Sequence, residues 1–515
     1  MTQSVDRRHL LRLGGAFSVL GTAAPFALQL AAASSAAAQS APDYKALVCV
    51  FLTGGNDSNN TVLATDSDSW GRYVSARGSS DSPIALMPPG TAPTVPGQVN
   101  SVTGRTATAS SPEAWGGVLP ITPKTAQAIP AGTKADKRTF ALHPYLGPVK
   151  TMFDQGRLAI VANVGTLLQP TTKAQYLAKA STIPPNLFSH NDQQSTWQAN
   201  AQEGVKVGWG GRMADMLASM NGQNTMFTAI STASRAVFLS GQSIAQYQLG
   251  PSAQPAILFG GAQGSSLFGA NMAPTRVHDL VTDTNLTNNF AADYATMVNR
   301  SMSAATTLNS AFAQPIAKGV AAPPAFINPM NQRGESNALA TQLQSVARMI
   351  AASATLGVRR QVFLVNLAGF DTHSDQNQNH PVLLAKLAHA LAYFDSALAN
   401  IGGIDRRNQV TTFTASDFSR SFTTNSNGSD HAWGGHHFVM GGAVRGGDIY
   451  GQYPTLGVDI NGFNNPDAVS GALIPTTSVD QYGATLGRWF GVSDSDLDTV
   501  FPRLKTFDKR NLGFV

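Results

Sequence analysis

The stretch "QVFLVNLAGFDTHSDQNQNH", residues 361–380, joins an apolar run to a turn crowded with ionisable side chains. The apolar run predicts a strand, 361–367, buried in a sheet. The turn contains four ionisable residues, namely Asp371, His373, Asp375 and His380. Polar turns are normally built from Ser, Gly and Asn rather than from repeated carboxylates and imidazoles. Such a concentration directly after a strand indicates a functional site.

Helix and strand patterns alternate around this stretch. A helix is expected over 335–357, with one apolar face made of Leu339, Leu343, Val346 and Ile350. A second helix follows the turn, with Pro381 in its first turn and Gly402-Gly403 at its end. A strand is then expected at 409–415. This order is typical of βαβ units, which form parallel sheets.

The same patterns predict the rest of the fold. Further strands are expected at 46–52, 157–163 and 226–231, and a C-terminal helix at 478–490. The expected class is α/β, with a mostly parallel central sheet flanked by helices on both faces. This domain should span residues 43–515 and carry an irregular insertion at about 66–140, which is rich in Ser, Pro, Gly and Thr.

Composition argues against several classes of function. Only 13% of the 515 residues are charged, against about 25% in ordinary globular proteins. The net charge of +5 comes without a Lys/Arg-rich run, so no nucleic-acid partner is expected. The single cysteine, Cys49, can form neither an intrachain disulfide nor a Cys-rich zinc site. Its apolar neighbours favour a small buried side chain.

The N-terminus has the pattern of an export signal. Basic residues precede a weakly apolar, Ala-rich stretch, and Arg7-Arg8 followed by Leu10-Leu11 is typical of a twin-arginine signal. We expect residues 1–38 to be this signal peptide, read by the twin-arginine export machinery, and the mature protein to be periplasmic or secreted. A retained membrane anchor is the alternative. No later segment has 18 continuous apolar residues, so no stable membrane span is expected in the mature chain.

Three Asp-bearing turns follow three predicted strands. They are "TGGNDSNN" after 46–52, "GFDTHSDQ" after 361–367 and "SDFSRS" after 409–415. The carboxyl ends of parallel strands share one edge of a sheet, and ligands bind there. A single Asp in such a turn usually caps a helix or stabilises the turn. Three at one edge, together with histidines, favour a metal site.

Histidines strengthen this interpretation. Asp371 and His373 are two residues apart, so an extended backbone places both on one face as half of a metal site. Asp375 either adds a ligand or caps a turn. The segment "GSDHAWGGHHFVMGG" contains His431, His436 and His437. Because neighbours in an extended segment point to opposite faces, only one of the adjacent pair is expected to bind metal.

A hydroxyl at a helix start could supply a nucleophile. The segment "NLFSHNDQQSTWQ", residues 186–198, places Ser189 and His190 just before an expected helix. Anions bind at helix N-termini, and nearby metal ions would lower the pKa of the hydroxyl. The alternative is that Ser189 only caps the helix.

The order of motifs resembles the exported family called domain of unknown function 1501. The resemblance covers roughly residues 43–505 and rests on "FLTGGNDSNNTV", "GFDTHSDQ", "SDFSRS" and "GSDHAWGGHHFVMGGAVRGGDIYGQYP". This family is grouped with the alkaline phosphatase and sulfatase superfamily. The resemblance therefore implies an alkaline-phosphatase-like fold and a two-metal site.

The resemblance also implies residue roles. Ser189 would be the nucleophile, and Arg420 would face a phosphate or sulfate oxygen. The metal ligands would be Asp57, Asp371, His373, Asp417, His431 and one of His436 and His437. Mixed Asp and His ligands favour zinc or manganese as the divalent metal, with calcium as a further alternative. Cys49 lies outside the Cys-x-Pro-x-Arg motif from which many sulfatases of the superfamily make their nucleophile.

The expected function is the metal-dependent hydrolysis of phosphate or sulfate esters, either small molecules or polymers, outside the cytoplasm. The alternative is an exported binding or assembly protein that keeps the fold without the chemistry. An enzyme should bring Ser189, Asp57 and Asp417 to one pocket. A binding protein need not, and the segment 66–140 could plug its site.

Overall fold

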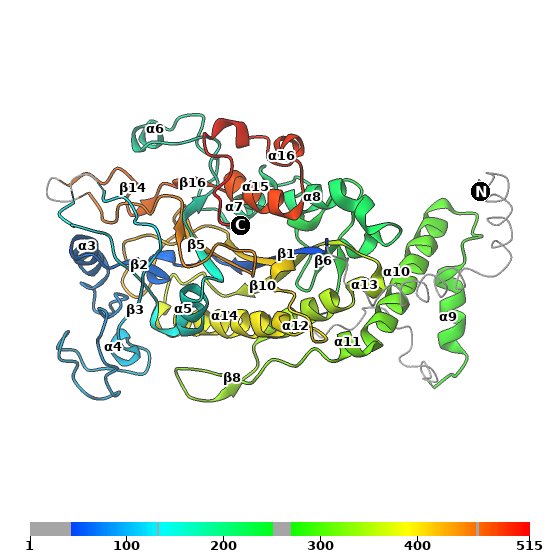
Figure 1. Cartoon of the computed structure of the whole chain (residues 1–515), viewed down its shortest axis with the longest axis horizontal. Coiled ribbons are helices and arrows are strands. Elements are labelled where there is room, and N and C mark those ends of the chain that lie inside the picture. The colour runs from blue at the N-terminus through cyan, green and yellow to red at the C-terminus, as the bar shows by residue number, and fades with distance from the viewer. Residues whose placement is uncertain (1–42, 131–132, 251–268, 460–462) are drawn as a thin grey trace, which may run out of the picture.

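A nine-stranded sheet lies at the centre of the protein (Figure 1). The computed structural model describes residues 43–130, 133–250, 269–459 and 463–515, so the expected signal peptide lies outside the described residues. The strands are ordered β13-β5-β12-β11-β1-β10-β6-β7, and β16 also pairs with β5. They are β1 (Lys45–Thr53), β5 (Leu158–Gly165), β6 (Ala229–Ser231), β7 (Tyr247–Gln248), β10 (Arg360–Ala368), β11 (Val410–Ser416), β12 (Gly435–Met440), β13 (Ile449–Tyr450) and β16 (Thr477–Ser478).

The sheet is mixed, which corrects the expectation of a mostly parallel one. β1 pairs in parallel with β10 and β11, and β6 continues this arrangement beside β10. β12, however, is antiparallel to both β11 and β5. The chain leaves β11 at Ser416 and returns as β12 from Gly435 without a crossover helix. A direct return of this kind gives antiparallel pairing, whereas parallel pairing needs a crossover.

Helices cover both faces of the sheet because the central strands are apolar on both sides (Figure 1). In β1, Val48 and Val50 belong to the core under one layer of helices, and Cys49 and Phe51 to the core under the other. One layer contains α5 (Gly147–Asp154), α12 (Ala338–Ala351) and α14 (Gln376–Ala399). The other contains α7 (His190–Ala199), α8 (Trp209–Leu217) and α15 (Val479–Phe490).

Most predicted elements lie within one or two residues of the observed ones. The helix expected over 335–357 is divided into α12 and the short α13 (Ser353–Leu356). The expected start of the next helix at Pro381 is wrong, because α14 begins at Gln376 and Pro381 lies inside it. Tertiary hydrogen bonds from Gln376 to Asp57 and from Asn377 to the carbonyl of Pro83 hold this additional turn. Sequence periodicity cannot reveal such contacts.

The segment 66–140 contains regular structure as well as loops. Its elements are α3 (Ser67–Arg77), α4 (Pro112–Trp115) and β3 (Leu119–Ile121). β3 joins β2 (Val62–Ala64) and β4 (Phe140–Leu142) in a small antiparallel sheet. α3 begins at the N-cap Asp66, whose side chain accepts from the backbone N–H of Ser69. It ends in Arg77, which is fully buried.

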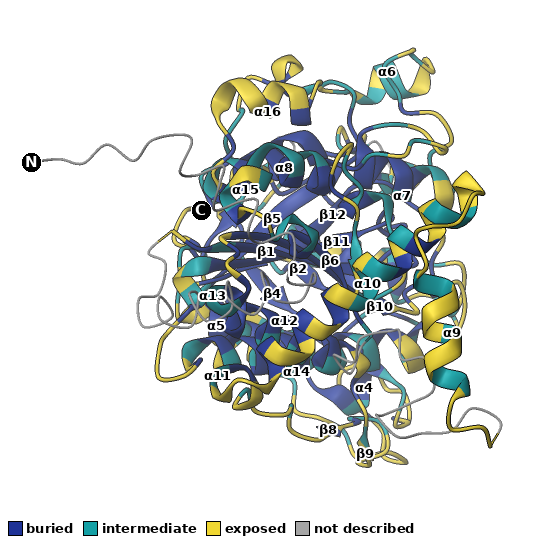
Figure 2. Cartoon of the chain, turned by 90° about the vertical axis from the view of Figure 1, so that its right-hand side faces the viewer, coloured by how far each residue is buried: buried dark blue, intermediate teal, exposed yellow. Residues whose placement is uncertain are grey.

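Peripheral elements complete the described chain. Figure 2 shows α9 with a largely exposed surface at one end of the molecule, beside α10. The peripheral helices are α6 (Lys173–Leu177), α9 (Ala273–Thr282), α10 (Asn289–Ala313), α11 (Pro315–Lys318) and α16 (Asp494–Val500). Two strand pairs lie outside the sheets, namely β8 (Phe326–Ile327) with β9 (Gly334–Glu335) and β14 (Ala468–Val469) with β15 (Ala472–Leu473).

One helix among the described residues, α14, is long and apolar enough to cross a membrane by length and composition alone. Half of its most apolar window is buried inside the protein. There it packs against α12 and α5, as the core helix of a water-soluble protein would. This arrangement is consistent with the expected lack of a stable membrane span.

Cys49 provides a probe of the core. Its side chain is buried in β1 and burial raises the pKa of its thiol well above the usual value. Because only a thiolate reacts rapidly, we expect no reaction with Ellman's reagent in the native protein and one thiol per chain in denaturing urea. Rapid reaction without urea would contradict the burial of β1. Cys49→Ser is the matched control, since it should give no signal under either condition.

Candidate functional site

The three Asp-bearing turns meet at the carboxyl ends of β1, β10 and β11. Thr53 at the end of β1 is aligned with Ala368 of β10, and Leu52 with Ser416 of β11. The buried guanidinium of Arg420 ties the turns together. It donates to the carbonyl oxygens of Gly54 and Gly55, at 2.5 and 3.0 Å, and to the carboxylate of Asp371. The predicted convergence of the turns is therefore present in the structure.

Four side chains form what we term the Asp/His cluster, namely His190, Asp371, His373 and His431. The Nε2 atoms of His373 and His431 are 2.8 Å apart. They lie 3.3 and 3.2 Å from Oδ1 of Asp371. His190 approaches the other oxygen, with its Nε2 3.5 Å from Oδ2. The structure thus brings together three imidazoles and one carboxylate from α7, the β10 turn and the segment between β11 and β12.

Each imidazole is oriented through its other ring nitrogen. Nδ1 of His431 lies 2.6 Å from the carbonyl oxygen of Phe188. Nδ1 of His190 lies 2.6 Å from Oδ2 of Asp417, and Nδ1 of His373 lies 3.2 Å from Oδ1 of Asp430. A carbonyl oxygen or an ionised carboxylate only accepts, so each Nδ1 is placed to donate. The Nε2 atoms face Asp371, and Nε2 of His431 lies within hydrogen-bonding distance of its Oδ1, at 3.2 Å.

The charge distribution favours an anionic Asp371 beside a neutral His431. Burial alone would raise the pKa of Asp371, but hydrogen bonding and charge from Arg420 lower it below the usual value. Burial lowers the pKa of His431. The side chains of Asp371 and His373 remain 48% and 46% exposed, whereas those of Asp417 and Arg420 are completely buried. The cluster therefore has a buried base and an opening to solvent.

Asp417 holds the cluster from its buried side. Its Oδ2 accepts from His190, from Nε2 of Gln194 at 3.0 Å and from the backbone N–H of Gly54 at 3.2 Å. Its Oδ1 is buried and has no hydrogen-bond partner among the described residues. Asp417 thus holds His190 in place and keeps one unused acceptor.

Asp57 lies at the same edge, but its carboxylate is occupied by other side chains. Arg77 donates to both oxygens, at 2.5 and 3.1 Å, and Gln376 donates to Oδ2 at 2.5 Å. Arg77 and Asp57 are both fully buried. Burial would raise the pKa of Asp57, but the adjacent guanidinium lowers it. Asp57, an expected metal ligand, is therefore observed in a buried ion pair. Its partner Arg77 lies in the segment 66–140.

Three other predicted residues also lie outside the cluster. Ser189 occupies the N-cap position of α7, but its hydroxyl donates to the carboxylate of Asp192 at 2.8 Å and makes no capping bond to the helix backbone. His436 and His437 are buried in β12 and point to opposite sides of the sheet. Nδ1 of His436 accepts from the backbone N–H of Asn163, and its ring stacks on Tyr453. His437 contacts Thr414, Trp197 and Tyr482.

Sequence reasoning missed the roles of His190, Gln194 and Asp430. His190 directly follows Ser189, and of this pair only the serine was assigned a role. In an N-terminal turn, neighbouring side chains diverge, so either could face the site. Asp430 precedes His431 as a visible Asp-His pair, but its partner is the ring of His373. Gln194 gave no signal, because a glutamine one turn into a helix has no distinctive chemistry.

The fold and the cluster together define an α/β protein with an Asp/His cluster at the carboxyl ends of its central strands. The family model described as "Protein of unknown function (DUF1501)" matches residues 44–501. The chain therefore belongs to this family, as the sequence motifs indicated. No match is found among curated proteins.

The Asp57–Arg77 pair generates a prediction about stability. Arg77→Met would leave a buried carboxylate without its counter-charge, so we expect a loss of about 3–5 kcal/mol in the free energy of unfolding. Urea denaturation followed by circular dichroism measures it. Adding Asp57→Asn should recover part of the loss, since both charges are then absent. Exposed Arg300→Ala is the control, and a cost for Arg77→Met as small as the control's would contradict this assignment.

His437 generates a prediction about pH. Burial lowers its pKa to about 3, whereas a histidine in the unfolded chain titrates near 6.5. Between these values the unfolded chain binds a proton that the native protein excludes, so stability falls as pH falls from about 6.5 toward 3. His437→Gln should reduce that slope by about 1.4 kcal/mol per pH unit. Urea titrations between about pH 6 and pH 4 test this, with exposed His278→Gln expected to leave the slope unchanged.

Proposed function

We propose that this protein is an exported, metal-dependent hydrolase of phosphate or sulfate esters, with one divalent ion held by Asp371, His373 and His431. One observation carries the proposal. Three imidazole Nε2 atoms converge on one carboxylate while each Nδ1 is held by an oxygen acceptor. The Nε2 atoms of His373 and His431 lie 2.8 Å apart, and both are close to Oδ1 of Asp371. A divalent ion at this point would be held by two imidazoles and one carboxylate.

The donor set fits one ion. Ligand atoms around a tetrahedral zinc, with bonds of about 2.0–2.1 Å, lie about 3.3 Å from one another. The three proposed donor atoms are separated by 2.8, 3.2 and 3.3 Å. Two imidazoles and one carboxylate favour zinc or manganese over calcium, which prefers oxygen ligands only. Three protein ligands and an exposed side are also the composition of a catalytic rather than a structural zinc site.

The bound ion would polarise the ester oxygen and lower the pKa of a bound water. His190 lies beside this position, with its Nε2 3.5 Å from Oδ2 of Asp371 and its Nδ1 2.6 Å from Oδ2 of Asp417. Asp417 would also stabilise the imidazolium that forms when His190 takes a proton from the attacking water. The same ring can return that proton to the leaving alcohol. His190 is thus proposed as the general base and general acid.

Two expected catalytic residues receive other roles in this proposal. The hydroxyl of Ser189 donates to Asp192, so water rather than Ser189 is the proposed nucleophile. Arg420 is fully buried and uses its N–H groups on Gly54, Gly55, Ser429 and Asp371. It positions Asp371 rather than contacting a substrate oxygen. The phosphate or sulfate ester class is supported by the resemblance to the alkaline phosphatase and sulfatase superfamily.

Export is the remaining part of the proposal. The twin-arginine pattern at Arg7-Arg8 supports passage to the periplasm or beyond in a folded state. Such a route would allow the ion to be loaded before export.

A second candidate function, non-catalytic binding or assembly outside the cytoplasm, is favoured by one observation. Arg77, which lies in the segment 66–140, forms an ion pair with the carboxylate of Asp57. The superfamily resemblance assigns Asp57 as a metal ligand. A protein that has lost one of two ions in this way could keep the fold and the remaining ion for binding alone. Turnover of an ester distinguishes the two functions.

Metal content and turnover of the full mature chain test the proposal. Plasma mass spectrometry should find about one zinc or manganese per chain in the wild type and in the exposed-histidine control His278→Ala. His373→Ala should lose most of the metal and the hydrolysis of p-nitrophenyl phosphate or sulfate. No bound metal after incubation with zinc, manganese or calcium would overturn the hydrolase.

His190→Gln separates proton transfer from metal binding. The variant should keep its metal, while kcat falls by about 10²–10⁴-fold. The plot of kcat against pH should also lose the limb that reports the general base. Loss of metal in His190→Gln would instead make His190 a ligand. Metal without any ester turnover in the wild type would favour the binding protein.

A further inference from the structure

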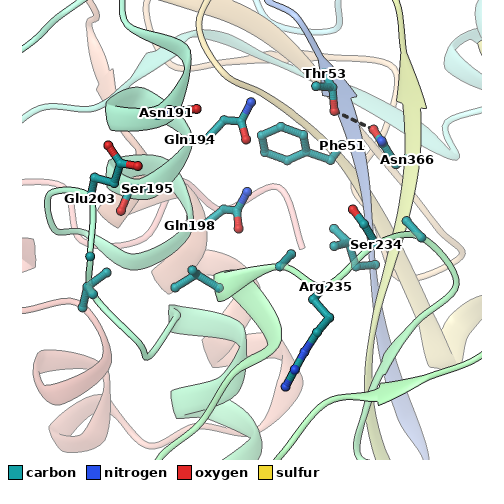
Figure 3. A pocket seen from close by; sticks show the side chains of 16 residues that line it. Phe51, Thr53, Asn191, Gln194, Ser195, Gln198, Glu203, Ser234, Arg235 and Asn366 are labelled. Atoms are coloured by element: carbon teal, nitrogen blue, oxygen red, sulfur yellow. Dashed lines mark hydrogen bonds between the residues drawn. The ribbon is translucent and has the colours of Figure 1, made fainter.

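A second feature of the site is a pocket of about 270 Å³ next to the Asp/His cluster (Figure 3). It lies between α7, the ends of β1 and β10, and the loop around Arg235. α7 carries His190 of the cluster at its first position and Gln194 one turn later, in the wall of the pocket. Gln194 also donates to Asp417, the partner of His190. The pocket and the cluster therefore share a wall.

The lining is rich in amides whose hydrogen-bonding capacity is only partly used. Figure 3 shows Gln194 and Gln198 extending from α7 toward Phe51. Gln198 accepts from the backbone N–H of Phe238, and Asn366 accepts from Thr53. The NH₂ groups of Gln198 and Asn366, and Oε1 of Gln194, have no partner among the described residues. Donors and acceptors side by side match adjacent hydroxyl groups, each of which both donates and accepts.

The charges of the pocket are balanced. Glu203 and Arg235 both line it, and neither forms an ion pair with any described residue. Figure 3 places them on different sides of the pocket. One carboxylate and one guanidinium leave no net charge to select an anion. The unused amides likewise disfavour a wholly apolar ligand, since they would lose water without gaining a partner.

The volume limits the size of the ligand. Pockets for drug-sized molecules commonly occupy about 300–1,000 Å³, and this pocket is slightly smaller. It therefore suits a single compact ring rather than an extended chain. Phe51, only 5% exposed, forms part of the floor.

We propose that this pocket binds the neutral, polyhydroxylated alcohol portion of the ester, such as one sugar ring. The inference rests on the proposed hydrolase for its catalytic meaning, because Gln194 lines this pocket and also bonds to Asp417, the partner of His190 in the cluster. Holding the non-reacting part of a substrate in this way contributes to rate through positioning. Asn191, Glu203 and Arg235 would supply the contacts that distinguish one sugar from another.

Sugar binding is testable without any turnover. The full mature chain is titrated with methyl glucoside, methyl galactoside and methyl mannoside, which carry no ester to cleave, by calorimetry and ligand-observed NMR. At least one glycoside should bind, and Arg235→Ala and Asn191→Ala should each weaken it about tenfold or more. Arg276→Ala, an exposed arginine on α9, is the matched control and should leave binding unchanged.

The outcomes distinguish failure of the sugar-binding proposal from failure of the proposed hydrolase. Glycoside binding that depends on Arg235 and Asn191 supports the pocket even if no ester is cleaved. Cleavage of p-nitrophenyl esters without binding of any glycoside overturns the pocket and leaves the hydrolase standing. Inorganic phosphate is titrated as a second probe. Arg235-dependent binding of phosphate, with no glycoside bound, would show an anion site and also overturn the proposal.

Discussion

The buried guanidinium of Arg420 is the interaction on which the arrangement of the site depends. It bonds to the turn after β1 through Gly54 and Gly55, to the turn after β10 through Asp371, and to the carbonyl of Ser429 just before the Asp430–His431 pair. A fully buried cation must be neutralised and hydrogen-bonded, because desolvation is otherwise too costly. The protein meets this need with loop carbonyls and one carboxylate. Three separate turns are thereby fixed relative to one another.

The aspartates at this edge of the sheet differ in what surrounds their carboxylates. Asp57 is closed off by Arg77 and Gln376. Asp371 is half exposed, and Arg420 bonds to its Oδ1, the oxygen that His373 and His431 also face. Asp417 is intermediate, since it is buried but still holds His190 and keeps an unpaired oxygen. Aspartates at equivalent positions, each directly after a parallel strand, therefore differ in chemistry because different side chains surround them. A two-metal pattern carried over from a family resemblance cannot capture that difference.

The sequence predicted the strands well because long apolar runs such as 46–52 and 361–367 are local signals. It also placed Asp371 and His373 at one edge, since strand ends determine that edge, whereas His431 was assigned to the site from the clustering of histidines and the family resemblance. It could not anticipate that β12 lies inside the sheet, antiparallel to β11 and β5, where both His436 and His437 are buried. Nor could it find the Asp57–Arg77 pair, because nothing marks the last residue of an amphipathic helix as a buried counter-charge. The extra turn of α14 before Pro381 likewise depends on tertiary contacts.

The position of β1 has a consequence for the order in which the chain folds. β1 is among the first described residues to be synthesised, yet its hydrogen-bonded neighbours are β10 and β11, far downstream. The contacts of Thr53 with Asn366 and of Leu52 with Ser416 span 313 and 364 residues. The centre of the sheet therefore cannot close until the ribosome has released residue 416. Chains dominated by such distant pairings fold slowly, so this apolar strand must wait, unpaired, through most of translation.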